Sequence, residues 1–282
     1  MKKIGLTLVA AFAMLVVAAG SAGAAITPVP VYNGSYAGPL PGNLPSVGAE
    51  AYSFKEFGDE VTFAGTQRTL GTVRVTMSSW ACELGTWANK DCVSTPGDKF
   101  HVPITLNIYN ASSHQGDGTV LPGSLITTAT HTFSIPYRPT ANLKHCNSGN
   151  SNTGKWWQGS TSTCFNGKAA NITFNFKSLG ITLPADVVIG IAYNTSHYGY
   201  SPIGETPSCY STEAGCPYDS LNIGLGPTVL VGSEPNPGTV FQNAVFGSDY
   251  CDSTPLTNVF NQDSPTSTCW SGYVPAMKVT AY

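Results

Sequence analysis

The sequence has few charged residues, and no segment of it is typical of an amphipathic helix. Lys, Arg, Asp and Glu make up 10% of its 282 residues, and the formal net charge is −3. This balance leaves no basic stripe for nucleic acid or for an anionic membrane surface, so partners held mainly by charge are excluded. No stretch long enough for a helix repeats its apolar positions with a period of 3.6 residues.

Motifs of hydrolytic and metal-dependent sites are also missing. No G-x-S-x-G occurs, and the five histidines have no recognisable Ser or Cys partner. Cys and His come together only at Lys144-His145-Cys146, which does not have the spacing of a zinc site. The run Gln115-Gly116-Asp117-Gly118-Thr119 has calcium-loop chemistry but supplies one carboxylate. We therefore expect a turn there, with a structural calcium ion as the alternative, and no other metal or cofactor.

The N-terminal segment has the three parts of an export signal. Lys2 and Lys3 precede an apolar stretch from Ile4 to Ala19, and small residues follow as far as Ala24. This order predicts a signal peptide over residues 1–24. Since the apolar stretch is shorter than a spanning helix and no later one is longer, we expect a secreted protein, extracellular, at the cell surface or periplasmic, with no membrane insertion after cleavage.

All eight cysteines lie beyond this segment. An even number in an exported chain predicts disulfides, although eight cysteines allow 105 connectivities. The simplest scheme pairs neighbours along the sequence: Cys82 with Cys92, Cys146 with Cys164, Cys209 with Cys216, and Cys251 with Cys269. Each pair would close a local loop and stabilise the fold by about 2–3 kcal/mol.

Apolar residues recur at every second position in segment after segment. Strands are predicted around residues 61–63, 73–77, 104–108, 133–137, 172–176, 187–193, 221–225 and 277–281. A period of two is typical of antiparallel sheets with one buried face. We therefore predict an all-β, antiparallel two-sheet sandwich, jelly-roll-like, with long disulfide-closed loops. Residues 25–48, rich in Pro and Gly, are expected to form an irregular arm, and residues 49–282 a single domain.

One segment carries a resemblance to a known group. Residues Glu56–Leu70 read EFGDEVTFAGTQRTL. This run resembles the GD-x-V-x-hydrophobic-AGT-x-R motif of exported bacterial β-sandwich proteins of poorly defined function. The runs Leu106–Asn110, Ile135–Pro139 and Tyr200–Gly204 are similar to members of the same group. The resemblance implies a jelly-roll-like fold and export, and it implies no reaction.

The residues of this motif predict a structural role. Gly58 and Gly65 relax the backbone at the ends of a short strand. Arg68 can bond to neighbouring backbone, or it can form an ion pair with the acids Glu56, Asp59 and Glu60.

All five tryptophans lie inside or beside the cysteine-bounded loops. Flat aromatic rings in loops at the rim of a β-sandwich can stack on sugar rings, which makes Trp87, Trp156 and Trp157 the candidate ligand-binding residues. The alternative is that each ring merely covers its own disulfide. The leading hypothesis is non-catalytic binding of a polysaccharide or another cell-surface component.

Two other classes of function stay open. A carbohydrate-active hydrolase or lyase would need two carboxylates about 5–9.5 Å apart. Asp59 and Glu60 are neighbours on a strand and point to opposite faces, and no other spacing marks a pair. A structural envelope or matrix protein is the second alternative. The catalytic residues therefore stay unknown, and an enzyme is the weaker expectation.

Overall fold

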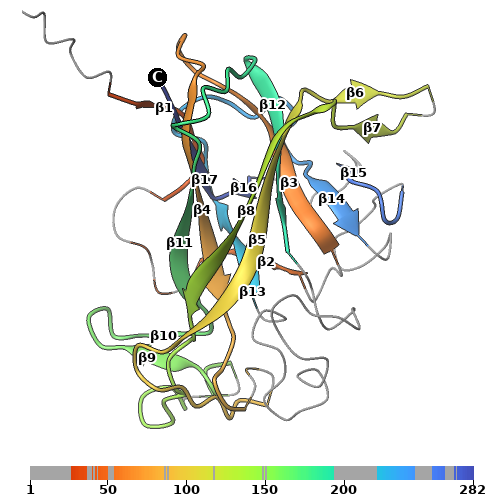
Figure 1. Cartoon of the computed structure of the whole chain (residues 1–282). Helices are drawn as coiled ribbons and strands as arrows, with labels where there is room; N and C mark the ends of the chain where they lie inside the picture. Colours follow the sequence, from red (N-terminus) through yellow and green to blue (C-terminus); the bar gives the residue numbers. More distant parts are fainter. Residues whose placement is uncertain are drawn as a thin grey trace, which may run out of the picture.

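The computed structural model contains the β-strands β1 to β17 (Figure 1). The structure describes residues 27–36, 40, 42, 44–49, 54–85, 87, 89–116, 118–147, 149, 151–193, 221–244, 256–263, 270 and 272–282. The strands are β1 (Val29–Asn33), β2 (Ser46–Gly48), β3 (Phe54–Thr62), β4 (Leu70–Ser79), β5 (Lys99–Asn110), β6 (Ser113–His114), β7 (Val120–Leu121), β8 (Leu125–Pro136), β9 (Trp156–Gln158), β10 (Thr163–Phe165), β11 (Lys168–Asn175), β12 (Asp186–Ala192), β13 (Leu221–Gly226), β14 (Phe241–Ala244), β15 (Asn261–Gln262), β16 (Val274–Pro275) and β17 (Met277–Ala281).

One antiparallel sheet has six strands in the order β15-β14-β3-β12-β5-β8. Its register places Gly58 of β3 beside Gly190 of β12, and Gly190 beside Asn107 of β5. A Cβ on Gly58 would collide with the backbone carbonyl of Ile189, so only glycine allows this close approach of β3 and β12.

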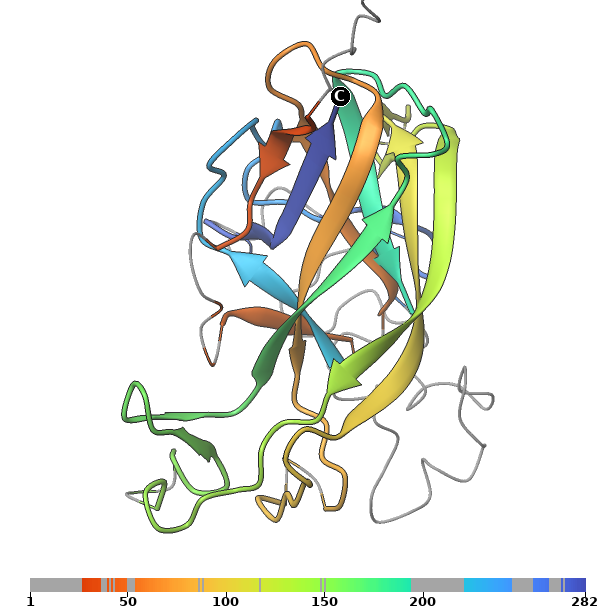
Figure 2. The same ribbon diagram turned by 60° about the vertical axis from the view of Figure 1, so that its left-hand side comes forward.

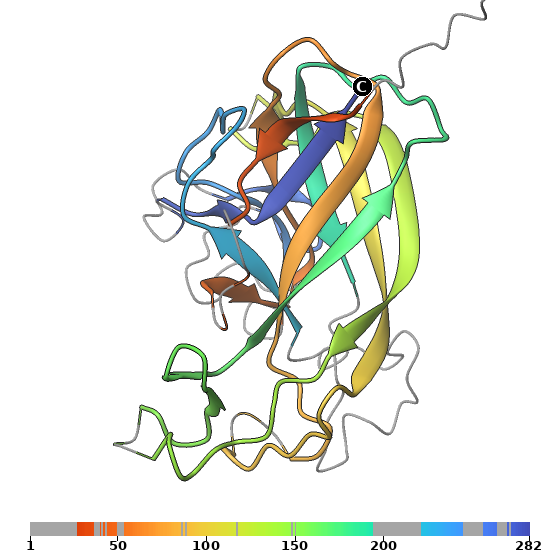
Figure 3. The same cartoon turned by 90° about the vertical axis from the view of Figure 1, so that its left-hand side faces the viewer.

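The second antiparallel sheet has seven strands and faces the viewer in Figure 3. Its path is β1-β17-β4-β13-β16, with β11 on the other side of β4 and β2 beside β13. The long strand β4 organises it, because Val75 pairs with Ile172 of β11 on one side and with Met277 of β17 on the other.

The two sheets share one hydrophobic core. Alternate residues of β4 and β5 are fully buried in it, namely Val73, Val75, Met77, Ile104, Leu106 and Ile108. Burial of these side chains supplies the main favourable free energy of folding. The predicted all-β, antiparallel fold with disulfide-closed loops is thereby confirmed, and every predicted strand is present. The jelly-roll-like connectivity stays a prediction.

The segment 25–48, expected to be irregular, contains two strands. Val29 of β1 pairs with Ala281 of β17, and Val47 of β2 pairs with Ile223 of β13. Pro30 is tolerated in β1 because that strand lies at the edge of its sheet, where a missing N–H removes no ladder bond on the open side. The high proline content of this segment thus limited its strands to edges without abolishing them.

Arg68 acts on the backbone. Its guanidinium donates to the carbonyl oxygens of Gln67 (2.8 Å), Ala64 and Phe63 (both 3.4 Å). These bonds favour the first of its two expected roles. Glu56 accepts from Asn107 and Tyr109, while Glu60 accepts from Ser112 and Asn236.

The run Gln115–Thr119 is the tip of the β6–β7 hairpin. The amide of Gln115 donates to the carbonyl of Thr119, and Gly118 has a φ of +87°. The turn is therefore present, while Asp117 lies outside the described residues. Among the residues that the structure does describe, no group of three His, Cys, Asp or Glu side chains is placed to hold a metal ion.

Several expectations fall outside the described ranges. These are the signal peptide over residues 1–24, the pairs Cys209 with Cys216 and Cys251 with Cys269, and the run Tyr200–Gly204. Within the described ranges, no helix is long and apolar enough to span a membrane.

Candidate functional site

Two disulfide-closed loops lie together at one end of the molecule, at the foot of Figure 2. The first, residues 80–98, joins β4 to β5 and is closed by Cys82–Cys92. The second, residues 137–167, joins β8 to β11, contains the β9–β10 hairpin and is closed by Cys146–Cys164. Both predicted pairs are confirmed. We call this pair of loops the stapled end.

Hydrogen bonds between the two loops make the stapled end one unit. The amide of Ser94 donates to Thr140 Oγ1 (3.0 Å), and that hydroxyl donates back to the Ser94 carbonyl (3.0 Å). The amide of Ala141 donates to the Cys92 carbonyl (2.9 Å), and the amide of Arg138 donates to the Ala81 carbonyl (2.9 Å). Each loop is thus closed by its own disulfide and is also joined to the other loop by hydrogen bonds.

A cavity of about 380 Å³ lies between these loops. Its walls come from both loops: Ser94, Thr95, Pro96 and Gly97 from the first, and Tyr137, Arg138, Pro139, Thr140, Asn142 and Trp157 from the second. The lining combines two aromatic rings with hydroxyl, amide and guanidinium groups. Six of the ten lining residues carry polar side chains, so the lining is more polar than that of a typical small-molecule pocket.

Arg138 is the charged side chain of the cavity. It is 1% exposed, and its Nη2 donates to the carbonyl oxygen of Gly154 (2.5 Å). Its Nε is buried and has no hydrogen-bond partner among the described residues. Burial lowers the pKa of the guanidinium to about 10, which still leaves it protonated at neutral pH. The site therefore contains a buried positive charge with donor capacity to spare.

Trp157 supplies the aromatic wall of the cavity. One ring face is stacked by the imidazole of His145, with centroids 4.7 Å apart and planes 16° from parallel. His145 is itself placed by a turn in which Asn142 Oδ1 accepts from the amides of Lys144 (3.1 Å) and His145 (3.0 Å). The stacked imidazole fixes the orientation of the indole before any ligand arrives.

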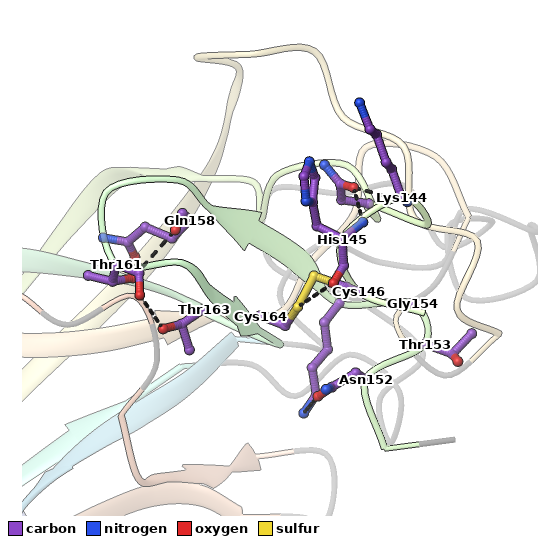
Figure 4. The surroundings of a disulfide bond; sticks show 12 residues. Lys144, His145, Cys146, Asn152, Thr153, Gly154, Gln158, Thr161, Thr163 and Cys164 are labelled. Carbon is purple, nitrogen blue, oxygen red and sulfur yellow. Dashed lines mark hydrogen bonds between the residues drawn. A yellow bond between two sulfur atoms is a disulfide. The ribbon is translucent and has the colours of Figure 1, made fainter. Parts of the chain in front are cut away.

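The disulfide Cys146–Cys164 joins this turn to β10 (Figure 4). Sγ of Cys164 lies 3.6 Å from the carbonyl oxygen of His145, and the amide of Cys146 donates to the carbonyl of Asn142 (2.8 Å). On the neighbouring strand β9, Trp157 pairs with Cys164. The disulfide therefore connects the two segments that carry the stacked rings of His145 and Trp157.

The other two candidate tryptophans lie outside the cavity. Trp156 is 4% exposed, its indole N–H donates to the Gly167 carbonyl (2.9 Å), and Lys168 lies over its ring. Trp156 is therefore part of the local core, which agrees with the alternative of a purely structural ring. Trp87 is 38% exposed and packs edge-on against Trp80. Of the three, only Trp157 lines the cavity.

The acids of β3 do not form a glycosidase pair. Asp59 shares the inner face with the core residues Phe57 and Val61, whereas Glu56 and Glu60 lie on the outer face. Four residues along a strand separate these two by about 13 Å, which exceeds the spacing of glycosidase carboxylates. The other acids considered for catalysis, Glu205, Glu213, Asp219, Asp249 and Asp252, lie outside the described residues.

Comparison of this chain with known protein families, with curated proteins and with solved structures finds no match.

Sequence reasoning overlooked Arg138, Tyr137 and Thr140. Nothing in the local sequence marks them as cavity residues, because their role depends on contact between loops that are far apart along the chain.

Proposed function

We propose that this protein is a secreted, non-catalytic binder of an extracellular polysaccharide, and that one sugar residue of the chain occupies the cavity of the stapled end. The observation that carries the proposal is the pairing of Trp157 with Arg138 in one cavity. A sugar ring has an apolar face of C–H groups that stacks on an indole, and it has oxygen atoms that accept from a guanidinium.

The size and the chemistry of the cavity support a sugar. A volume of about 380 Å³ is near the lower end of the range for small-molecule pockets, about 300–1,000 Å³. It fits one or two sugar rings. Ser94, Thr95, Thr140 and Asn142 line the cavity with hydroxyl and amide side chains, which are chemically suited to the hydroxyl and ether oxygens of a polysaccharide.

The disulfides support export. Cys82–Cys92 and Cys146–Cys164 form and persist in oxidising compartments, outside the cell or in a periplasm. With the N-terminal segment typical of a signal peptide, they favour a protein that meets polysaccharide outside the cytoplasm. The resemblance of Glu56–Leu70 to exported bacterial β-sandwich proteins agrees with this and adds no ligand.

The test is a titration of the oxidised protein with a panel of neutral and acidic polysaccharides, followed by tryptophan fluorescence and calorimetry. We expect at least one polysaccharide to bind, and Trp157→Ala to weaken that binding by at least tenfold. Trp87→Ala is the matched control, because Trp87 is an exposed loop tryptophan outside the cavity. Circular dichroism and a thermal melt would establish that both variants fold.

Two results would overturn the proposal. One is the absence of binding across the panel, and the other is binding that Trp157→Ala leaves unchanged. Release of reducing ends during the titration would instead favour a hydrolase.

A further inference from the structure

Strand β8 forms an open edge of the six-stranded sheet. It has 12 residues and pairs with β5 on one side, from Leu125 to Pro136. In the described part of the chain no strand pairs with its other side, and the backbone of residues 126–136 has no hydrogen bonds apart from those to β5. A long edge of this kind presents a row of free amide and carbonyl groups.

This edge lacks the usual protection against strand pairing. From Leu125 to Ile135 the sequence is LITTATHTFSI, with no Lys, Arg, Asp, Glu, Gly or Pro. The only register irregularity against β5 lies near its first residues, between Ile108 and Tyr109 of β5. Charges, prolines and central bulges are the common devices that keep edge strands apart, whereas Thr, Ile and Phe favour strands.

The inner face of β8 packs against the core, and its outer face is exposed to solvent. On its inner side the ring of Phe133 packs on Phe174 of β11, with centroids 5.0 Å apart. On its outer side Thr128, Thr130 and Thr132 are exposed. The edge is therefore an ordered template whose backbone needs little rearrangement to accept a further strand.

We propose that β8 pairs antiparallel with β8 of a second copy of this chain, joining two six-stranded sheets across a twofold axis. A strand related to itself by a twofold axis is always antiparallel, which makes the interface isologous and closed. Centred on Thr130, this register places Thr130 opposite its own copy and Thr128 opposite Thr132, so each hydroxyl side chain meets another and no fixed charge meets its like.

The six-stranded sheet offers no second long edge. The strand at its far end, β15, has only two residues, so within this sheet β8 is the long edge available to another copy. The proposal does not depend on the cavity of the stapled end.

Sedimentation velocity over a concentration series, with hydrogen exchange of the β8 amides at each concentration, tests the proposal. We expect a monomer–dimer equilibrium in which rising concentration protects the β8 amides. Thr130→Lys places two like charges opposite each other and should weaken dimerisation about tenfold or more. Thr163→Lys is the matched control, because Thr163 is an exposed strand threonine outside this sheet and pairs with the uncharged Gln158.

Two results would overturn the proposed β8 dimer. A protein that stays monomeric at millimolar concentration, with β8 amides that exchange freely throughout, overturns the proposal. So does a dimer that Thr130→Lys leaves as tight as the wild type. Since Thr130 is exposed, the lysine variant should fold, and its thermal melt would verify this.

Discussion

The pH dependence of stability should reveal two acids with raised pKa values, the buried Asp59 and the half-buried Glu234. Asp59 of β3 is 1% exposed, and its Oδ1 accepts from the amide of Glu60 (2.8 Å). Within the described residues, three buried oxygen atoms here have no hydrogen-bond partner: Asp59 Oδ2, one carboxylate oxygen of Glu234, and the hydroxyl oxygen of Tyr32. Burial raises the pKa of Asp59 well above its usual range, and the neighbouring charge of Glu234 raises it further. Burial likewise raises the pKa of Glu234, to about 7.

The sign follows from the direction of these shifts. A carboxyl whose pKa is higher in the folded than in the unfolded protein stabilises the fold below its unfolded pKa, and that stability is lost as the pH rises through the folded pKa. For Glu234 the window runs from 4.5 to about 7. At about 1.4 kcal/mol per pH unit this corresponds to roughly 3.4 kcal/mol, and partial exposure of Glu234 to solvent reduces it to roughly 1.5–2 kcal/mol.

Urea unfolding between pH 5 and pH 8, followed by tryptophan fluorescence, measures this effect. The free energy of unfolding of the wild type should fall by roughly 2 kcal/mol across that range. Glu234→Gln should reduce the fall and be the more stable protein at pH 8, while the burial of Asp59 accounts for the part that is left. Asp98→Asn, at an exposed acid, should follow the wild type. Equal slopes for the wild type and Glu234→Gln would refute the idea that these acids are held uncharged in the fold.

Two further predictions concern the disulfides and the sheet. Replacing Cys146 and Cys164 by Ser should lower the free energy of unfolding by about 3 kcal/mol, as the loop-entropy model gives for a separation of 18 residues, and abolish sugar binding at the cavity; retained binding in a calorimetric titration would contradict the role given to this disulfide. Gly58→Ala should lower the melting temperature by several degrees, because its Cβ would meet the backbone of Ile189, whereas Gly116→Ala, with open space around it, should have little effect; equal melts would contradict the assigned close approach.

The sequence predicted the long strands because their alternation is a local property. Strands β5 and β11 bury every second residue, whereas β4 and β12 are buried along most of their length; in all four, apolar residues alternate along the sequence. The strands it missed are short or polar. Strand β14, Phe241–Ala244, reads FQNA and is a strand because β3 lies beside it with a register shift, which no local pattern encodes.

The candidate site was only half predictable for a related reason. Aromatic residues beside cysteines pointed to the correct end of the molecule, and Trp157 lines its cavity. The adjacent Trp156 looks the same in sequence but faces the other way, because consecutive residues of a strand point to opposite sides. Strand β9 has only three residues, too few for its alternation to be recognised beforehand.

The buried guanidinium of Arg138 is the feature of the stapled end that favours a ligand-binding role over a purely structural one. A charge removed from water destabilises the fold unless its donors are satisfied, and an apolar side chain of similar volume would fill the same space without that cost. In the described structure one carbonyl, that of Gly154, accepts from the guanidinium, while its Nε lacks a partner. The Nε has almost no accessible surface, so a sugar oxygen would satisfy it only after the two loops shift. In the proposed complex that hydrogen bond would form away from water, which would strengthen it.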